Sequence, residues 1–177
     1  MNEVVFRALC ACFGLVPSSD AASLLIRAAY QEPEPFPQPP RSTNVVYYAA
    51  EPDPTAAEAP PAYGSDSPAS AAHTPSVSFF SAWVLHIVCY GPNAMDNARK
   101  IRAFLYLDGT GFPRSVLRKA GIYPVPDPPE PMELHEPEGS LWRLRADLTI
   151  RLRVKEKQEH RTRRNAITVP PAIEIRI

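Results

Sequence analysis

The side chains of this chain that could do chemistry are its histidines, cysteines, grouped carboxylates and a run of basic residues. The histidines are scattered along the sequence, and none stands at metal-ligand spacing from another histidine or from a cysteine pair: His73, His86, His135 and His160. We therefore expect no metal site and no catalytic histidine. His86, which lies inside an apolar run, is interpreted as a satisfied or partly buried strand residue.

The cysteines do not form a disulfide pattern. Cys10 and Cys12 are two residues apart near the N-terminus, and Cys89 lies in an apolar run. Three cysteines are too few and too oddly numbered for a disulfide framework. We expect buried, reduced thiols that pack as small apolar side chains, in a soluble protein of a reducing compartment.

Enzyme signatures are missing from the sequence. Gly109-Thr-Gly111 completes neither a Walker loop nor a dinucleotide fingerprint, and there is no Gly-x-Ser-x-Gly elbow. Carboxylates in Asp127–Glu138 could imitate an acid/base pair, but the segment is proline-rich and predicted to be a mobile, solvated loop. The prediction is a protein that is not an enzyme and that binds no cofactor.

The basic run extends from Arg143 to Arg164 and holds nine Lys/Arg against three acids, a net charge of +6. Three interpretations stay open: a solvated outer strand face, pairing with the acidic loops of the same chain or a neighbouring copy, and contact with nucleic-acid phosphates. The aromatic residues expected between the basic residues of a single-strand binder are absent from this run. The candidate interface residues are Arg143, Arg145, Arg151, Arg153, Lys155, Arg161, Arg163 and Arg164.

Length and composition limit what can position these residues. The 177 residues predict one domain, 1–177, with zero formal net charge and 45% apolar residues. The 22 prolines are more than twice the average share of about 5%. They concentrate in two acidic blocks, Glu32–Pro75 and Pro124–Pro137, which we expect to be connectors. The first contains a Pro/Ala/Ser-rich insert at about 51–75, and the second an acidic loop at about 124–138.

Apolar spacing predicts about three helices. The first is Asn2–Phe13, which Gly14 ends, and the second is Ala21–Tyr30, which Ser18-Ser19-Asp20 can cap and whose buried face would hold Leu24, Leu25, Ala28 and Ala29. The third is Ala94–Leu107, with Asn93 as its cap and one apolar stripe of Ala94, Ala98, Ile101 and Leu105. A short helical turn is expected at Arg114–Ala120, closed by Gly121.

Alternating residues predict the strands. Asn44–Ala50 is rich in β-branched and aromatic residues, and Ser76–Tyr90 is apolar on both faces in its latter half, as in a strand covered on both sides. Leu141–Lys155 alternates strictly between apolar and charged residues, and its length means that its far end should project from the core. A short final strand is expected at Ala172–Ile177. The fold class is therefore α+β, with a mostly antiparallel sheet packed by helices. The apolar run Ala82–Tyr90 is too short to cross a membrane.

The order of these pieces resembles the phage neck terminator, or tail terminator, proteins. The first two features are the N-terminal helix leading to Ile26-Arg27-Ala28-Ala29-Tyr30-Gln31, and the strand Asn44–Ala50. The third is the long strand that runs into Val88-Cys89-Tyr90-Gly91-Pro92-Asn93-Ala94, where the family has an aromatic-Gly-x-Asn-Ala turn that opens a helix. The others are the Trp-containing strand Leu141–Val154 and Thr168-Val169-Pro170 before a closing strand. The resemblance covers most of the chain apart from roughly Glu51–Pro75.

The resemblance implies a structural virion protein of the neck, present in the host cytoplasm during assembly. Such proteins form a ring, typically of six copies, that ends the tail tube. The ring joins the tail to the head-completion (stopper) protein and lets DNA pass through its lumen. The partners implied are copies of the chain itself, the stopper and the tail tube protein, with no membrane. The alternative, from the basic run alone, is a basic-faced nucleic-acid-binding accessory domain.

Overall fold

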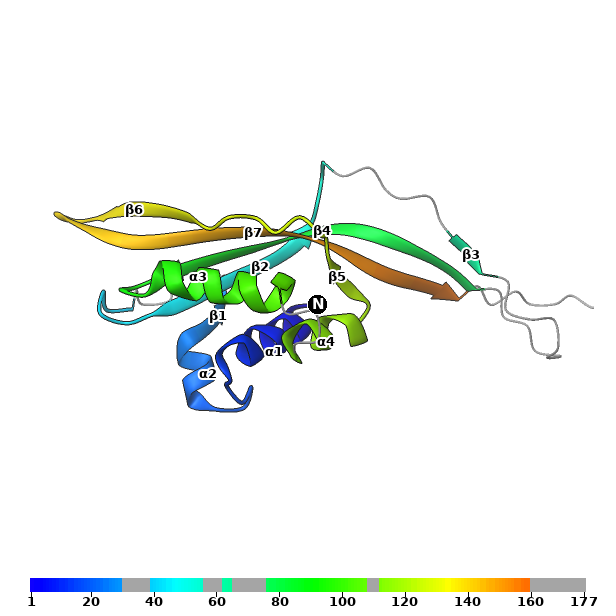
Figure 1. Cartoon of the computed structure of the whole chain (residues 1–177), viewed down its shortest axis with the longest axis horizontal. Helices are drawn as coiled ribbons and strands as arrows, with labels where there is room; N and C mark the ends of the chain where they lie inside the picture. Colours follow the sequence, from blue (N-terminus) through cyan, green and yellow to red (C-terminus); the bar gives the residue numbers. More distant parts are fainter. Residues whose placement is uncertain (30–38, 56–61, 65–75, 108–111, 160–177) are drawn as a thin grey trace, which may run out of the picture.

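The fold is seen in a computed structural model that describes residues 1–29, 39–55, 62–64, 76–107 and 112–159 (Figure 1). Several predictions from sequence fall outside the described residues. They concern His73, His160, Gly109–Gly111, Thr168-Val169-Pro170, the final strand Ala172–Ile177, and the basic residues Arg161, Arg163 and Arg164.

A seven-stranded sheet forms one layer of the protein. Its main path runs β1 (Ile26–Ala28), β2 (Val45–Pro52), β4 (Ser76–Tyr90), β7 (Leu141–Glu159) and β5 (Ile122–Pro124). Two further strands pair with the ends of the long ones: β3 (Ala62–Gly64) with β4, and β6 (Met132–Glu138) with β7. All of these pairings are antiparallel except β1 with β2.

Helices form the second layer, on one side of the sheet (Figure 1). They are α1 (Asn2–Phe13), α2 (Asp20–Leu25), α3 (Ala94–Arg102), which continues as the π-helical segment η1 (Ala103–Leu107), and α4 (Phe112–Lys119). The predicted α+β class is confirmed. Four α-helices are described, of which α4 was expected only as a short helical turn at Arg114–Ala120.

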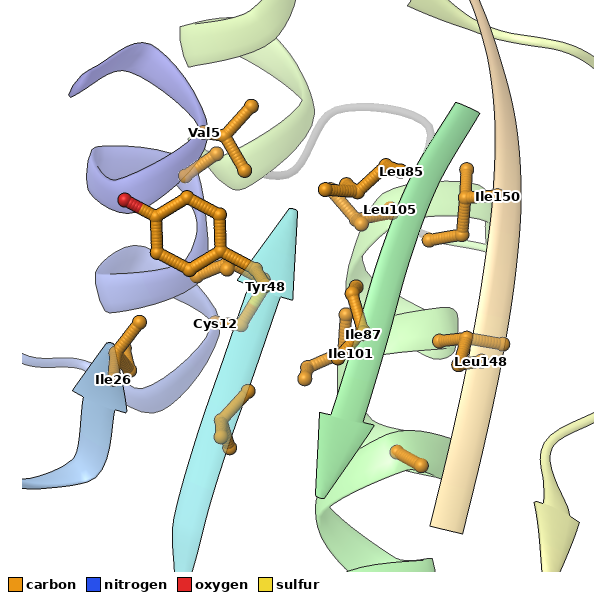
Figure 2. Packing of buried hydrophobic residues seen from close by; sticks show 14 of the residues in the cluster. Val5, Cys12, Ile26, Tyr48, Leu85, Ile87, Ile101, Leu105, Leu148 and Ile150 are labelled. Carbon is orange, nitrogen blue, oxygen red and sulfur yellow. The ribbon is translucent and has the colours of Figure 1, made fainter. Parts of the chain in front are cut away.

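The core lies between the two layers. Along the middle of β7, every second side chain is buried there and forms part of one side of the core. Leu148, Ile150 and Leu152 are buried, as are Leu85 and Ile87 of β4. In Figure 2 the labelled side chains of β4 (Leu85, Ile87) and β7 (Leu148, Ile150) lie on the same side of the sheet as Ile101 and Leu105 of the α3–η1 helix. The predicted stripe Ala94, Ala98, Ile101 and Leu105 is entirely buried. Alternation therefore identified the core face of the longest strand correctly.

The turn between β4 and α3 depends on a glycine. Gly91 has φ +104°, and a Cβ there would lie 2.6 Å from the Thr43 carbonyl oxygen and 2.8 Å from Asn44 Cα. Only glycine accommodates both the backbone angle and this close approach. Asn93 occupies the N-cap position of α3 as predicted, but its side chain makes no cap hydrogen bond. Its backbone N–H instead donates to Asn44 Oδ1 at 2.9 Å, which ties the turn to the start of β2.

The second predicted helix, Ala21–Tyr30, is shorter than expected. Ser19 caps it by accepting the Ala22 N–H, but it ends at Leu25 because Ile26–Ala28 pairs in parallel with Val46–Tyr48. Leu24 is 61% exposed, so the predicted apolar face was wrong. A buried β-branched residue at position 26 gains more from the sheet edge than from one further helical turn.

The second acidic block is not only a connector. Its residues Met132–Glu138 form edge strand β6, which pairs with Leu141–Asp147 through a hairpin turn at Gly139. Proline is tolerated on an edge strand because its missing N–H can face solvent. The expectation of a mobile acidic loop was therefore wrong for this stretch. The insert at about 51–75 within the first block contributes the end of β2 and the short β3.

The helices cover one face of β4, although its sequence predicted cover on both. Leu85, Ile87 and Cys89 are buried, whereas Val84, His86, Val88 and Tyr90 on the other face are half-buried. The β6–β7 hairpin extends beyond the helical layer at one end of the molecule, and β4 and β7 extend beyond it at the other (Figure 1). The prediction that the overlong strand projects is confirmed, and β7 reaches Glu159 rather than Lys155.

Candidate interaction surface

The sheet face opposite the helices is the candidate functional surface, called the open face below. Strand register assigns it the odd residues of β2 and β7 and the even residues of β4. It carries apolar and aromatic side chains along β2 and β4 and charged side chains along β7. Its central members are Tyr47, Ala49, Glu51, Val84, His86, Val88, Tyr90, Arg143, Arg145, Asp147, Thr149, Arg151 and Arg153.

Arg143 is enclosed by its own chain. It is 5% exposed, and its guanidinium lies 4.6 Å from the ring centroid of Tyr90. One terminal nitrogen donates to the Pro39 carbonyl oxygen at 3.0 Å, and the other lies 3.9 Å from Glu138 Oε1. Its buried Nε has no hydrogen-bond partner within the described structure. Arg143 therefore joins the β6–β7 hairpin to the segment before β2.

Arg145 lies beside it and is neutralised by two carboxylates. It donates to both Asp147 oxygens, at 2.6 and 2.7 Å, and lies 3.6 Å from Glu136. The hydrogen bonds to Asp147 raise the pKa of the Arg145 guanidinium, so its charge is fixed. Tyr90 donates to Glu136 Oε2 at 2.7 Å. Burial first, and then this hydrogen bond, raises the pKa of Tyr90 to about 12.

A pocket of about 300 Å³ opens beside this network, lined by Tyr47, Val88, Tyr90, Glu138 and Arg143 among others. Arg41 holds the lining residue Glu138: its Nε donates to Glu138 Oε2 at 2.8 Å, and a terminal nitrogen donates to the Glu138 carbonyl oxygen at 2.6 Å. Tyr47 and Tyr90 meet edge to face at 5.9 Å.

The other basic residues of β7 lie farther along the strand and point to solvent. Arg151, Arg153 and Lys155 are exposed on the open-face side. Arg151 and Arg153 line a shallow hollow of about 250 Å³ together with Asp53 and Thr55 of the segment after β2. The eight predicted interface residues therefore fall into three sets: Arg143 and Arg145 are paired within the chain, these three are exposed, and three lie outside the described residues.

The histidines and cysteines have modest surroundings. His86 is half-exposed on the open face, and its Nε2 is 3.2 Å from Glu51 Oε1. This agrees with the prediction of a partly buried strand residue. The free thiols Cys10, Cys12 and Cys89 are all buried, and burial raises the pKa of Cys12 and Cys89 to about 12. Among the described residues, no group of His, Cys, Asp or Glu could hold a metal ion. No helix there has the length and apolar character needed to cross a membrane.

Sequence reasoning missed the acidic partners of the arginines. Glu136 and Glu138 were assigned to a loop, yet β6 places them directly opposite Arg143 and Leu141. The distribution of charge could have predicted this pairing, because an acidic block without basic residues directly precedes a net basic strand. Pairing within the chain was one of the three interpretations of the basic run. It is confirmed for Arg143 and Arg145.

The comparison with known families identifies the fold. The family model described as phage neck terminator protein matches residues 3–175. The chain belongs to this family. No individual curated protein matches the chain significantly.

Membership of the neck terminator family gives the open face its context. Neck terminators are structural proteins of the virion neck rather than enzymes, and they act by contact with other head and tail proteins. The resemblance drawn from the helix order, the Gly91 turn and the Trp-containing strand is confirmed. In a neck terminator, large exposed surfaces are sites of assembly, so the open face and the projecting strand ends are the parts of this subunit to interpret.

Proposed function

We propose that this neck terminator subunit assembles into a ring of six copies that caps the tail tube and joins the tail to the head-completion (stopper) protein. The ring leaves a lumen through which DNA passes. Assembly takes place in the host cytoplasm, before the neck becomes part of the virion. The observation that carries this proposal is the long β4–β7 ribbon, which projects past its helical layer and leaves one face open (Figure 1).

The open face has the chemistry of a surface that a neighbour covers. Val84 and Val88 of β4 and Tyr47 of β2 are only half-buried there, although a solvated strand face is normally polar. The exposed charges stand along one edge of this apolar strip, on β7. An apolar centre with a charged rim is the usual anatomy of a protein interface.

The basic residues of β7 are assigned to contacts between subunits or to the lumen. Arg151, Arg153 and Lys155 are exposed, and Arg161, Arg163 and Arg164 continue the basic sequence. Arg143 and Arg145 support this surface by holding the β6–β7 hairpin. The neutral balance of the whole chain suits a contact that repeats around a closed ring, because each copy supplies both signs of charge.

Nucleic-acid binding as the main function fits the geometry less well. Arg143 and Arg145 already pair with carboxylates, so they cannot neutralise phosphates without breaking those contacts. Each lost phosphate contact lowers both affinity and its dependence on salt. Passage of DNA through a lumen needs only weak contact.

The decisive experiment is electron microscopy of lysates from a phage that lacks this gene. Filled heads without tails, together with tails of irregular or excessive length, are expected. Normal virions would reject the proposal.

A charge reversal tests the assigned residues. Supplying Arg151→Glu with Arg153→Glu from a plasmid should leave most heads unjoined. The control, Arg99→Glu with Lys100→Glu, makes the same change of charge on α3 of the helical layer and should restore joining. Equal joining by the two variants would refute the assignment to β7.

A further inference from the structure

The β6–β7 hairpin exposes large apolar side chains among its charged residues, although it projects into solvent. We define the tip as Met132–Leu144. Trp142 is 67% exposed, Met132 62% and Leu141 60%. Trp142 and Leu141 are adjacent near the turn, whereas Met132 is at the other end of β6, opposite Asp147. Isolated exposed apolar residues are common, but an exposed tryptophan is enriched at protein interfaces, so Trp142 indicates a contact site.

The tip has a rigid base. Arg143 and Tyr90 fix it from the open face, and Arg41 holds Glu138. The hairpin is therefore a preorganised projection, which reduces the entropy lost on binding. Its remaining charge is acidic: Glu133 is exposed, and its nearest cationic candidate, His135 Nε2, is 4.0 Å away.

A groove of complementary character lies on the helical layer, between α1 and α4. It has a volume of about 450 Å³ and is lined mainly by apolar side chains: Val4, Ala11, Leu15, Phe112 and Val116. Phe112 is 68% exposed at one end. Arg7 and Lys119 also line the groove, and Arg118 is exposed next to Lys119. Arg7 pairs with Glu3 at 2.5 Å, so among the described residues of the groove the unpaired basic charge is on α4. The groove is thus apolar with a basic border, whereas the tip is apolar with an acidic border.

We propose that the hairpin tip of one copy docks in the α1–α4 groove of the next copy. This inference rests on the proposed ring and names the contact that closes it. Trp142 packs on Phe112 within the groove, and Glu133 meets Lys119. The occupant is a second copy because charge and apolar surface on the tip complement those of the groove on the same chain.

The spacing of these contact points agrees with such docking. Trp142 is opposite Pro137, and Glu133 lies four strand residues from Pro137, or about 13 Å along β6. Phe112 and Lys119 are seven helical residues apart, or about 10 Å along α4. The lengths of the Glu and Lys side chains cover the difference.

The contact cannot form within one chain. The hairpin tip extends past the helical layer at one end of the molecule, whereas α4 lies toward the other end (Figure 1). Tip and groove are different surfaces, so the contact is head-to-tail. Head-to-tail contacts build rings when the rotation between copies closes.

Cross-linking in the assembled neck tests the contact directly. Leu141→Cys and Val16→Cys place one thiol beside Trp142 and another beside the groove residues Leu15 and Pro17, and keep both proposed anchors. The native cysteines are buried, so their background is low. Under mild oxidation, virions that carry both changes should give a ladder of cross-linked dimers, trimers and larger multimers. Virions that carry only one of the two changes should give no cross-linked species larger than a dimer. The matched control is Leu141→Cys with Leu24→Cys, since Leu24 is equally exposed but off the groove. Virions with both designed cysteines but no ladder would overturn the proposal.

A charge exchange covers the case in which the cysteine variants do not assemble. Glu133→Lys and Lys119→Glu should each reduce the fraction of joined heads by about tenfold or more, because like charges then face each other. The two changes in one chain should recover most of the joining. Loss without recovery would reject the pairing. Failure of this contact can be distinguished from failure of the ring proposal. If the ring proposal is wrong, a phage that lacks the gene still forms normal virions.

Discussion

Removal of Arg143 tests whether this basic residue is a structural bridge rather than a surface charge. Arg143→Met keeps most of the apolar stem and removes the guanidinium. The lost contacts are one charged hydrogen bond to the Pro39 carbonyl, worth about 1.5–3 kcal/mol, and stacking on Tyr90, worth about 1–2 kcal/mol when desolvated. The 3.9 Å contact with Glu138 adds little, because Arg41 also holds that carboxylate. Relief of the unpaired buried Nε offsets part of the loss. The expected net loss is about 2–3 kcal/mol of unfolding free energy.

The measurement is urea unfolding of the purified chain, with Arg151→Met as the matched control. Arg151 is exposed on the same strand, so its loss should cost within about 0.5 kcal/mol. A thermal scan should show Tm lower by roughly 5–10 °C for Arg143→Met, on the scale of 2–4 °C per kcal/mol for a chain of this size. Equal stabilities of the two variants would refute the view that the hairpin is anchored through Arg143.

Two further predictions concern the β4–α3 turn and alkaline pH. Gly91→Ala should lower the unfolding free energy by about 3–5 kcal/mol, because φ is +104° and the new Cβ meets backbone at 2.6–2.8 Å. Gly139→Ala, with φ +64° and open space around it, should cost only about 1–2 kcal/mol in the same urea titration; similar losses for both would contradict the close-approach explanation. Stability should also fall as pH rises from about 9 to 12, because the folded state holds Cys12, Cys89 and Tyr90 protonated, with pKa values raised to about 12 from 9.0 for the thiols and 10.0 for the phenol. Urea midpoints should therefore be highest below pH 9, and Tyr90→Phe should reduce the decline above pH 10; a flat profile would refute the assignment.

Much of the fold follows from local patterns. Three predicted features have direct local causes, and the structure has them where they were predicted. They are the alternating strand Leu141–Val154, the buried helix stripe Ala94, Ala98, Ile101 and Leu105, and the end of the first helix at Gly14 after Phe13. The errors arose where long-range pairing outweighed local signals. Ile26 leaves a helix because β2 offers it an edge, and a proline-rich acidic stretch becomes β6 because β7 supplies the partner strand.

The candidate surface was harder to predict than the fold. The sequence located the basic strand but could not separate Arg143, which is buried, from Arg151, which is exposed, since both occupy odd positions of one alternating run. Their difference depends on which neighbours stand opposite each end of β7. At one end Glu136, Glu138 and Tyr90 enclose the guanidinium groups; toward the other, β5 covers only a short stretch of the strand.

The same asymmetry supports the proposed contacts between copies. At one end the chain uses its acidic residues to hold a hairpin rigid, and so it presents Trp142 and Leu141 without polar cover. Toward the other end Arg151, Arg153 and Lys155 are exposed, and the paired strand β5 has no acidic residue to offset their charge. In the proposed ring, identical copies arranged head-to-tail would bring these two surfaces together, so that each copy supplies the charge that its neighbour lacks. The stability of such a ring would depend on the number of contacts made at once, because each copy in a closed ring gains a contact on both sides.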